Sequence, residues 1–503
     1  MFAAQVAQAR DRLAGRLAAQ VGSDGAVQGW CASRVLESVL VLTLLRQEHQ
    51  YPDVQNALIR YLHAQRPAAG SFDELLVRAA VTGERRRSQE TLIWLDEFEH
   101  FTTSRKRLMF HAILAVLGIV PHDEHLDPSR IYYTGFTSWV NLTLCALKIL
   151  HAFGLGRDEL VTDTDRAFLT GQLETGSSHE IREGHLLSHV LGLMAVRRCE
   201  PCGARVRDGI DKLVRHRNPD GGFPFIAGLE IFCTVTAGLA LAGTEHRALE
   251  RIANYLAAMQ RPDGGWAYAE QVRQTDTDDT AYCTQFLRAA APLRHARTIR
   301  AAERYLTDIA NVDGGFPTFR KGHRSESTMT SGALRALAPA WQDHSRLCET
   351  ATKYLLDAQE PAGTFERSWS LSESNAIFRT ISALSAVPRG QAGHLRDRIG
   401  WVMARSMRYL QATQNHDGGW GQRSGDPSDV ISTSYALLVM PGNGDGARYL
   451  LSQQRHDAGF ISVPDQAGPR PLPYDVPVLA DIFALWALDR VTAHNSGRSR
   501  GGG

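Results

Sequence analysis

The sequence of this 503-residue chain predicts an all-α fold in which helix pairs close into α–α barrels. Two observations carry the prediction. A turn motif recurs along the chain at the ends of expected helices, and apolar residues between the turns follow helical spacing, as in 330–337 and 434–439. Long stretches of alternating apolar and polar residues, which would predict strands, are missing from the sequence.

The recurring turn follows a Tyr-Leu pair and a Gln placed four residues after the Leu. Its best copies are Tyr255-Leu256, Gln260 and 263–266, and Tyr409-Leu410, Gln414 and 417–420. Weaker copies end at Phe72, Phe223, Phe316, Phe365 and Phe460. From Phe223 onward the aromatics lie about 40 to 55 residues apart, which indicates repeating units of two helices each.

Each part of the turn has a physical role. The Asp-Gly-Gly sequence supplies a tight turn whose glycines can adopt positive φ. The Gln can hydrogen-bond exposed backbone groups at a helix end. The aromatic residue packs on neighbouring helices, so Trp266 and Trp420 are expected to be structural.

The density of the repeats predicts the domain organisation. Residues 205–490 form one barrel, and residues 21–204, with weaker copies, form a second and diverged barrel. Residues 1–20 read as an amphipathic helix. Residues 491–503 are predicted to be a disordered tail, because the end of the chain is small, basic and rich in glycine.

Composition excludes several function classes. A net charge of +1 gives no global reason to bind nucleic acid. The longest apolar runs are shorter than the roughly 18 residues that a membrane-spanning helix requires, so no transmembrane segment is predicted. Seven scattered cysteines, an odd number, fit reduced thiols in a cytoplasmic protein better than a disulfide framework.

The chemistry is concentrated in Asp276-Thr277-Asp278-Asp279-Thr280, which follows the turn at Trp266. Three carboxyl groups within four residues cannot all ionise cheaply if they share a buried site. At least one is then held as the neutral acid, which is the group needed to protonate a weak base such as an alkene. The alternatives for this segment are a solvated acidic loop and a helix N-terminus at which the helix dipole favours acidic residues.

The repeats, taken together with the Asp-x-Asp-Asp motif, resemble the class II terpene cyclase family, which includes squalene–hopene cyclases and copalyl-type diphosphate cyclases. The resemblance covers most of the chain and is strongest over 205–490. It implies two α-barrel domains, called β and γ, with residues 205–490 as the catalytic β domain and residues 21–204 as the γ-like domain. It also implies that residues 1–20 pack with the β domain.

The resemblance further implies roles for particular residues. Asp278 is expected to be the general acid that protonates the terminal double bond of the substrate, while Asp276 and Asp279 orient it. Aromatic faces can stabilise the carbocation that forms. Tyr282, Phe316 and Trp369 are the candidate residues of the substrate pocket.

A prenyl diphosphate substrate needs basic partners and Mg²⁺. The basic segment 320–324 offers Lys321 or Arg324 as diphosphate-binding residues, although a solvated basic loop is an equal alternative; no metal ligands are identified. The Asp-Asp-x-x-Asp metal motif of ionising terpene synthases is incomplete, because Tyr282 stands where its third Asp would be. The product is therefore expected to keep its diphosphate and to pass to a separate class I synthase or phosphatase.

Several alternatives stay open. Geranylgeranyl diphosphate (C20) is the favoured substrate, giving a bicyclic diphosphate; farnesyl diphosphate (C15), giving a drimane-type diphosphate, and neutral squalene are the enzymatic alternatives. A protein prenyltransferase subunit would need zinc, but Asp279 and Cys283 have unsuitable spacing. A helical-repeat binding protein is the non-enzymatic alternative. Neither the ring stereochemistry nor the oligomeric state follows from the sequence.

Overall fold

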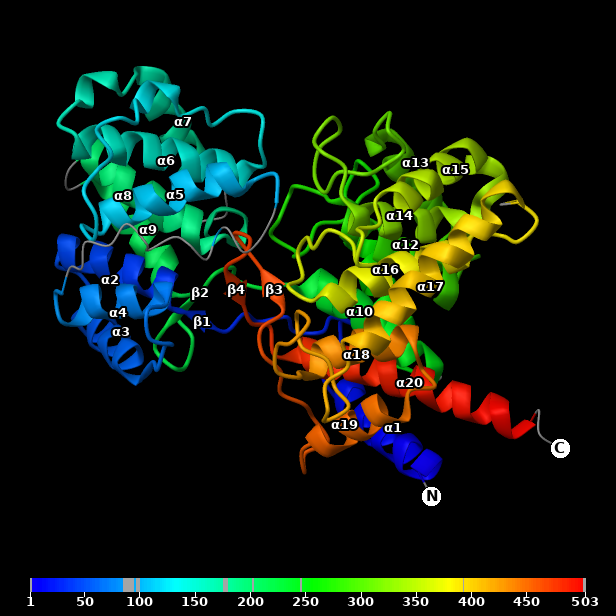
Figure 1. The fold of residues 1–503 in the computed structure, drawn as a ribbon. Coiled ribbons are helices and arrows are strands. Elements are labelled where there is room, and N and C mark those ends of the chain that lie inside the picture. The colour runs from blue at the N-terminus through cyan, green and yellow to red at the C-terminus, as the bar shows by residue number, and fades with distance from the viewer. Residues whose placement is uncertain are drawn as a thin grey trace. The chain divides into compact units, whose positions relative to one another are not determined.

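A computed structural model describes residues 2–84, 95, 100–174, 180–200, 203–244, 247–391 and 393–500, with side chains as far as 496. Helices dominate these residues, as the all-α prediction requires (Figure 1). The chain divides into two compact units. Unit 1 comprises Met1–Trp30, Leu229–Ala467 and Asp475–Gly503, and unit 2 comprises Cys31–Gly228 and Gly468–Tyr474.

Unit 1 is a closed ring of helices. Its elements are α1 (Phe2–Ala19), α10 (Glu230–Leu241), α11 (Ala248–Ala258), α12 (Thr277–Ala290), α13 (Ala296–Ile309), α14 (Ser327–Leu337), α15 (Trp341–Asp357), α16 (Glu373–Ala386), α17 (Arg396–Ala412), α18 (Val430–Val439), α19 (Gly444–Gln453), β3 (Gln466–Ala467) and α20 (Val478–Arg500). The even-numbered helices α10 to α20 pack against one another in succession, and α20 also contacts α10. These contacts close an α–α barrel.

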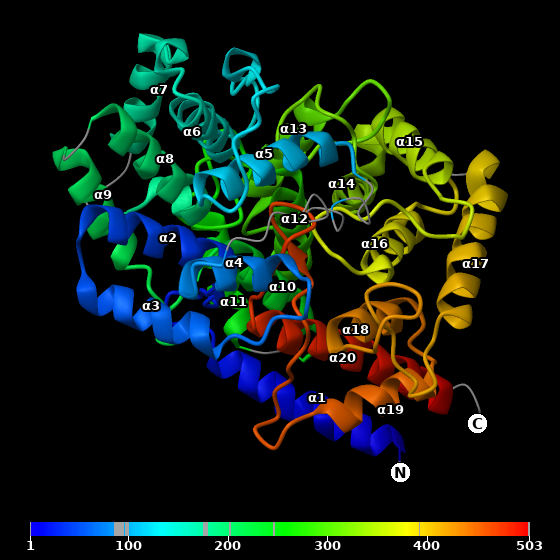
Figure 2. The same ribbon diagram turned by 60° about the vertical axis from the view of Figure 1, so that its left-hand side comes forward.

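The odd-numbered helices form the outer layer of this barrel. α11 packs on α10, α13 on α12, α15 on α14, α17 on α16 and α19 on α18, while α1 packs on α20 (Figures 1 and 2). The sequence explains the two layers. Inner helices such as α10 are buried almost all round. The outer helix α13 buries a single stripe that includes Ile299, Ala302, Leu306 and Ile309.

The turns of unit 1 have the predicted geometry. Gln260 donates from its side-chain amide to the carbonyl of Gly264 at 2.8 Å and to Thr298 of α13 at 2.9 Å. Trp266 is fully buried, and its indole N–H donates to the carbonyl of Leu256 at 2.7 Å. The structural role expected for the turn aromatics is therefore confirmed for Trp266, and Trp420 bonds to Leu410 in the same way.

The same geometry explains why α1 belongs to unit 1. In the last repeat, Gln454 bonds to its own turn at Ala458 and to the carbonyl of Ala9 in α1. α1 thus takes the place that α13 occupies next to Gln260. The first helix of the chain completes the outer layer beside α20.

Unit 2 is a smaller helical unit. Its elements are β1 (Ser33–Arg34), α2 (Val35–Glu48), α3 (Pro52–Ala64), α4 (Phe72–Val81), α5 (Thr103–Val116), α6 (Ser138–Gly154), α7 (Asp163–Glu174), α8 (Leu186–Cys199), α9 (Ala204–Val214), β2 (Phe223–Pro224) and β4 (Pro473–Tyr474). α8 packs against α2, α6, α7 and α9. β1 pairs antiparallel with β2, with Arg34 opposite Phe223.

Two predicted boundaries differ from the structure. The sequence break at 199–203 lies between α8 and α9, which pack on each other, so unit 2 extends to Gly228 instead of ending at 204. The tail predicted to be disordered from residue 491 is helical as far as Arg500, because α20 continues and Val491 is buried. Residues 501–503 lie outside the described residues.

Among the described residues, no helix combines the length and the apolar character that crossing a membrane requires.

The repeat turn generates a stability prediction. Gly264 has φ +91°, and a Cβ added there would lie 2.5 Å from the carbonyl oxygen of Ala301. Gly264→Ala should lower the free energy of unfolding by about 1–3 kcal/mol in a urea denaturation experiment, because the turn is both strained and crowded.

The matched control is Gly400→Ala in the outer helix α17, where an added Cβ meets no atom within 4 Å. It should raise the free energy of unfolding by about 0.5–1 kcal/mol through helix propensity. Equal effects of the two substitutions would contradict the role assigned to the turn.

Candidate active site

The acidic motif lies at the start of α12, and the residues at both of its ends, Asp276 and Thr280, are hydrogen-bonded to the repeat turn. The backbone N–H of Asp276 bonds to the carbonyl of Trp266, and the backbone N–H of Trp266 bonds to the hydroxyl of Thr280, both at 2.9 Å. Asp276 is the N-cap of α12, and its carboxylate accepts from the backbone N–H of Asp279 at 2.8 Å. A carboxylate at this end of a helix also complements the helix dipole.

Two of the three carboxyl groups are deeply buried. Asp276 and Asp279 are each 3% exposed, and Asp279 Oδ1 has no hydrogen-bond partner among the described residues. Burial, together with the neighbouring carboxyl groups, raises the pKa of both residues. The pair is therefore disposed to keep a proton under conditions in which ordinary aspartates lose theirs, which agrees with the expectation of a neutral acid in this motif.

Asp278 has different surroundings. Its side chain is 14% exposed and forms an ion pair with the guanidinium of Arg379, from α16. Arg379 Nη1 lies 3.2 Å from Asp278 Oδ2, while Nη2 bonds to Oδ1, so the contact is bidentate. Nη2 also donates to the carbonyl of Thr328 in α14 at 3.2 Å, and the guanidinium stacks over the ring of Tyr282 at 4.6 Å.

A glycine makes room for this ion pair. A Cβ added at Gly332 of α14 would lie 2.8 Å from Arg379 Nη2 and 3.7 Å from Asp278 Oδ1. The inner helices α12, α14 and α16 can bring Asp278 and Arg379 together because α14 carries no side chain at this point.

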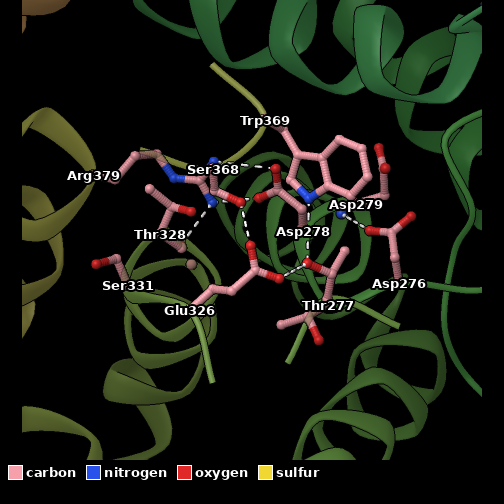
Figure 3. Close-up of polar contacts among 12 residues, drawn as sticks. Asp276, Thr277, Asp278, Asp279, Glu326, Thr328, Ser331, Ser368, Trp369 and Arg379 are labelled. Atoms are coloured by element: carbon pink, nitrogen blue, oxygen red, sulfur yellow. Dashed lines mark hydrogen bonds and ion pairs between the residues drawn. The ribbon is translucent and has the colours of Figure 1, made fainter. Parts of the chain in front are cut away.

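A second polar network adjoins the acid (Figure 3). Glu326, before α14, accepts hydrogen bonds from Thr318 Oγ1 at 2.5 Å and from Ser368 Oγ. Trp369 donates from its indole N–H to Thr318 Oγ1 at 3.2 Å. The backbone carbonyl of Thr318 accepts from the N–H of Thr277, the residue before Asp278, at 2.8 Å. Thr277, the neighbour of Asp278, and the indole of Trp369 are thus both hydrogen-bonded to Thr318.

A further buried carboxylate, Asp465, links the segment before α16 to Tyr435 of α18. It accepts from Ser370 Oγ at 3.0 Å, from Ser372 Oγ at 2.5 Å and from the hydroxyl of Tyr435 at 3.4 Å. Ser372 also contacts Ser432 of α18 at 2.6 Å. Burial raises the pKa of Asp465, although these hydrogen bonds oppose the shift.

The three residues predicted to line the substrate pocket lie in different environments. Tyr282 is 3% exposed and lies against Arg379 and, edge to face, against Phe232 at 5.9 Å. Trp369 is half-buried in the Glu326 network. Phe316 is completely buried in the hydrophobic core of unit 1, which differs from the pocket role expected for it. It is the aromatic of a repeat turn and packs helices as Trp266 does.

The predicted diphosphate-binding residues lie in a different environment from the acid. Lys321 is exposed. Arg324 lines a cavity of about 530 Å³ together with Lys353 and the carboxylates of Asp313, Asp357, Glu360 and Glu366. Four acidic side chains around two basic ones are unfavourable for a diphosphate, so the structure does not support the role expected for Arg324.

The sequence predicted Mg²⁺ bound with the diphosphate, without identifying protein ligands for it. Within the part of the chain that the structure describes, no group of three or more His, Cys, Asp or Glu side chains is placed to hold a metal ion. No protein ligand is therefore assigned to Mg²⁺. Cys283, considered for zinc, is completely buried.

Three residues of the site, Arg379, Glu326 and Asp465, were not predicted from the sequence. Two of them carry a signal in the sequence. Arg379 is the single charged residue between Glu373 and Arg389, inside an apolar helical stretch. Glu326 follows its turn aromatic by ten residues, as Asp276 follows Trp266. Asp465 carries no comparable signal, because its hydrogen-bond partners lie 30 to 95 residues away in the chain.

Comparison with known proteins agrees with the predicted fold. The family model of the prenyltransferase alpha-alpha toroid domain matches residues 188–441. A drimenyl diphosphate synthase of Streptantibioticus cattleyicolor is 42% identical over 507 residues, which cover 95% of this chain and 93% of that protein. A drimenyl diphosphate synthase of Streptomyces showdoensis is 40% identical, covering 98% and 96%.

More distant similarities point the same way. A squalene–hopene cyclase of Zymomonas mobilis is 28% identical over 292 residues, covering 46% of this chain and 42% of that protein. The solved structure of the ent-copalyl diphosphate synthase from Streptomyces platensis has a TM-score of 0.60 and covers 97% of this chain and 99% of its own. At 18% identity, that structure shows a shared fold alone.

The repeat counterpart of Asp276 generates a pH prediction. Asp429 caps α18 by accepting from the backbone N–H of Ser432 at 2.8 Å, and burial raises its pKa from 3.8 to about 6. Ionising Asp429 therefore costs free energy in the folded protein that it does not cost in the unfolded chain. Stability should fall as the pH rises from about 4 to about 6.

Asp429→Asn keeps an oxygen that can cap the helix but has no proton to lose. In urea denaturation at a series of pH values, the variant should lack a fall in unfolding free energy on the order of 2–3 kcal/mol between pH 4 and 7. If unfolding free energy depends on pH in the same way in both proteins, whatever the constant offset between their curves, the assignment is contradicted.

Proposed function

The chain belongs to the class II terpene cyclase family, and from this premise we propose that it cyclises farnesyl diphosphate to a bicyclic drimenyl-type diphosphate. The sequence alone favoured a C20 substrate. A C15 substrate is supported instead by two relatives at 42% and 40% identity, both drimenyl diphosphate synthases that align along nearly the whole chain. Membership of this enzyme family also removes the prenyltransferase-subunit and binding-protein alternatives.

The observation that carries the proposal is the difference in exposure within the acidic motif. Asp276 and Asp279 are buried, whereas Asp278 is partly exposed and can meet a substrate. We assign Asp278 as the general acid. Its O–H bond breaks as a C–H bond forms at the terminal double bond, and the bidentate contact with Arg379 stabilises the carboxylate that remains.

The carbocation is then consumed by the remaining double bonds. Attack by the π electrons of two neighbouring double bonds closes two rings, and the final cation loses a proton, so the product is an isomer of the substrate. Exclusion of water protects the intermediate cations. The Asp276 carboxylate accepts from the backbone N–H of Asp279 and so fixes the first turn of α12, which carries Asp278.

The proposed product keeps its diphosphate. Tyr282 stands where a third Asp would complete the metal motif of ionising synthases, and it packs against Arg379. Mg²⁺ is proposed to accompany the diphosphate, because phosphate oxygens are its preferred partners. A class I synthase or a phosphatase is then the class of enzyme that would consume the product.

The first prediction of this proposal concerns Asp278→Asn, which keeps the shape of the side chain but has no transferable carboxyl proton. With Mg²⁺ and farnesyl diphosphate, the purified protein should give a bicyclic alcohol that is seen by mass spectrometry only after phosphatase treatment. The substitution should reduce its formation by about 10²–10⁴-fold.

Thermal denaturation of the variant checks that the fold is intact. Geranylgeranyl diphosphate and squalene, tested in parallel, decide the substrate. A bicyclic C20 product with no C15 product would move the proposal to the longer diphosphate. Squalene turnover alone would replace it, and an Asp278→Asn variant with full activity would remove Asp278 as the acid.

A second prediction tests the ion pair without deleting either of its members. Gly332→Ala places a methyl group against Arg379 Nη2, so the guanidinium must move away from Asp278. We expect kcat to fall by about tenfold with an unchanged KM for farnesyl diphosphate.

Gly400→Ala, on the outer helix α17, is the control for a glycine-to-alanine change in the same unit. An unchanged kcat in Gly332→Ala would show that the contact between Arg379 and Asp278 has no part in proton transfer.

A further inference from the structure

The residue before each of three inner helices occupies an equivalent position. The backbone N–H groups of Asp276, Glu326 and Asp429 each bond at 2.9 Å to the carbonyl of their own turn aromatic. Asp276 and Asp429 use their carboxylates to cap the helix that follows. Glu326 makes no side-chain cap bond to α14. One additional methylene group takes its carboxylate away from its own helix.

The carboxylate of Glu326 is instead used to tie two other segments together. It accepts from Thr318 Oγ1, in the loop after the Phe316 turn, and from Ser368 Oγ, in the segment before α16. Glu326 is 3% exposed. A carboxylate buried to this degree is costly unless it is hydrogen-bonded, and hydroxyl donors to both of its oxygens offset that cost.

The two residues that donate to Glu326, Thr318 and Ser368, both restrain Trp369. The Thr318 hydroxyl has one proton, which it gives to Glu326, so its lone pairs are oriented to accept the indole N–H of Trp369 at 3.2 Å. Ser368 is the residue before Trp369. Phe319, the residue after Thr318, meets the indole edge to face at 5.7 Å. Both the backbone and the ring of Trp369 are thus restrained through Glu326.

The same threonine is attached to the acid. The carbonyls of Pro317 and Thr318 accept from the hydroxyl and the N–H of Thr277, at 2.6 and 2.8 Å. Asp278 follows directly in the chain. Figure 3 shows Glu326, Trp369 and Asp278 converging from three different segments. Asp278 and Trp369 keep some exposure, whereas Glu326 is buried behind them.

We propose that Glu326 is a positioning residue that holds the Trp369 indole in a fixed orientation beside Asp278, and that this orientation decides whether the second ring closes. The inference rests on the proposed function. An indole face attracts a neighbouring cation, so a fixed face favours one path for the charge formed after protonation. An indole free to rotate leaves that cation time to lose its proton after a single ring closure, which gives a monocyclic diphosphate.

The test uses variants that break the chain of hydrogen bonds at different points. Glu326→Gln replaces one acceptor oxygen by an amide group that donates, so it cannot accept from both hydroxyls. Thr318→Val removes the hydroxyl with little change in volume, and Thr318→Ser retains it. With farnesyl diphosphate and Mg²⁺, products are separated by gas chromatography–mass spectrometry after phosphatase treatment. The monocyclic share of the product should rise at least about tenfold in the first two variants and stay near that of the wild type in Thr318→Ser.

A double-mutant cycle with Trp369→Phe separates positioning from a general effect on the barrel. If Glu326 acts through the indole, adding Glu326→Gln to Trp369→Phe should change the ratio of monocyclic to bicyclic product no further. Independent, multiplicative effects of the two substitutions would overturn the proposal. Asp429→Asn is the matched control, because it alters a buried acid at the equivalent position that caps its own helix, and it should leave the product ratio unchanged.

The outcomes separate this inference from the proposed function. A wild-type protein that forms the bicyclic diphosphate, with a product ratio that Glu326→Gln does not alter, would overturn the inference and leave the function standing. A wild-type protein that forms no cyclic diphosphate from either the C15 or the C20 substrate would overturn both.

Discussion

Carboxyl groups buried at the N-terminal ends of inner barrel helices are the constraint on which the rest of the site depends. Each would be costly alone, because desolvation opposes its charge. At α12 the helix dipole and the backbone N–H of Asp279 offset part of that cost for Asp276, and Arg379 offsets it for Asp278. The guanidinium comes from α16, two helices along the ring. The acid can therefore exist only inside the closed barrel that brings α12, α14 and α16 together.

The barrel also places the three carboxyl groups of the motif in different surroundings. A group that protonates an alkene must hold a proton and must also be stable after losing it. Burial favours the protonated form of Asp276 and Asp279, whose pKa values are raised, while the ion pair with Arg379 offers two donors to the ionised form of Asp278. Asp276 and Asp279 are thus disposed to keep a proton, whereas the conjugate base of Asp278 is stabilised by two donors from Arg379.

Much of the fold could be predicted from the sequence, because its signals are local. The Gln, the Asp-Gly-Gly turn and the aromatic act within one repeat, and the barrel follows from repeating them. The acidic motif was identified for the same reason. Arg379 was missed because it lies 101 residues from Asp278 along the chain and meets it only through the ring of helices. The limits of unit 2 were missed because 468–474 returns to it from a distant part of the sequence. Phe316 was assigned to the pocket because a turn aromatic looks the same in sequence whether it packs a core or faces a substrate.

Comparison of the repeats with one another explains why the chemistry is confined to α12. Two residues after the equivalent position, α12 has Asp278, α14 has Thr328 and α18 has Ile431. Four residues after it, Thr280, Thr330 and Thr433 all make the same bond to the turn aromatic. The scaffold residues are therefore repeated while the reactive position is not. Glu326 also departs from the repeat. Its backbone keeps the hydrogen bond to the turn aromatic, but its side chain does not cap the helix that follows. In a protein built from repeats, a residue can keep the backbone hydrogen bonds of its position while its side chain makes different contacts from those of its counterparts. Folding of the repeat does not require that side chain, so such residues are candidates for a functional role.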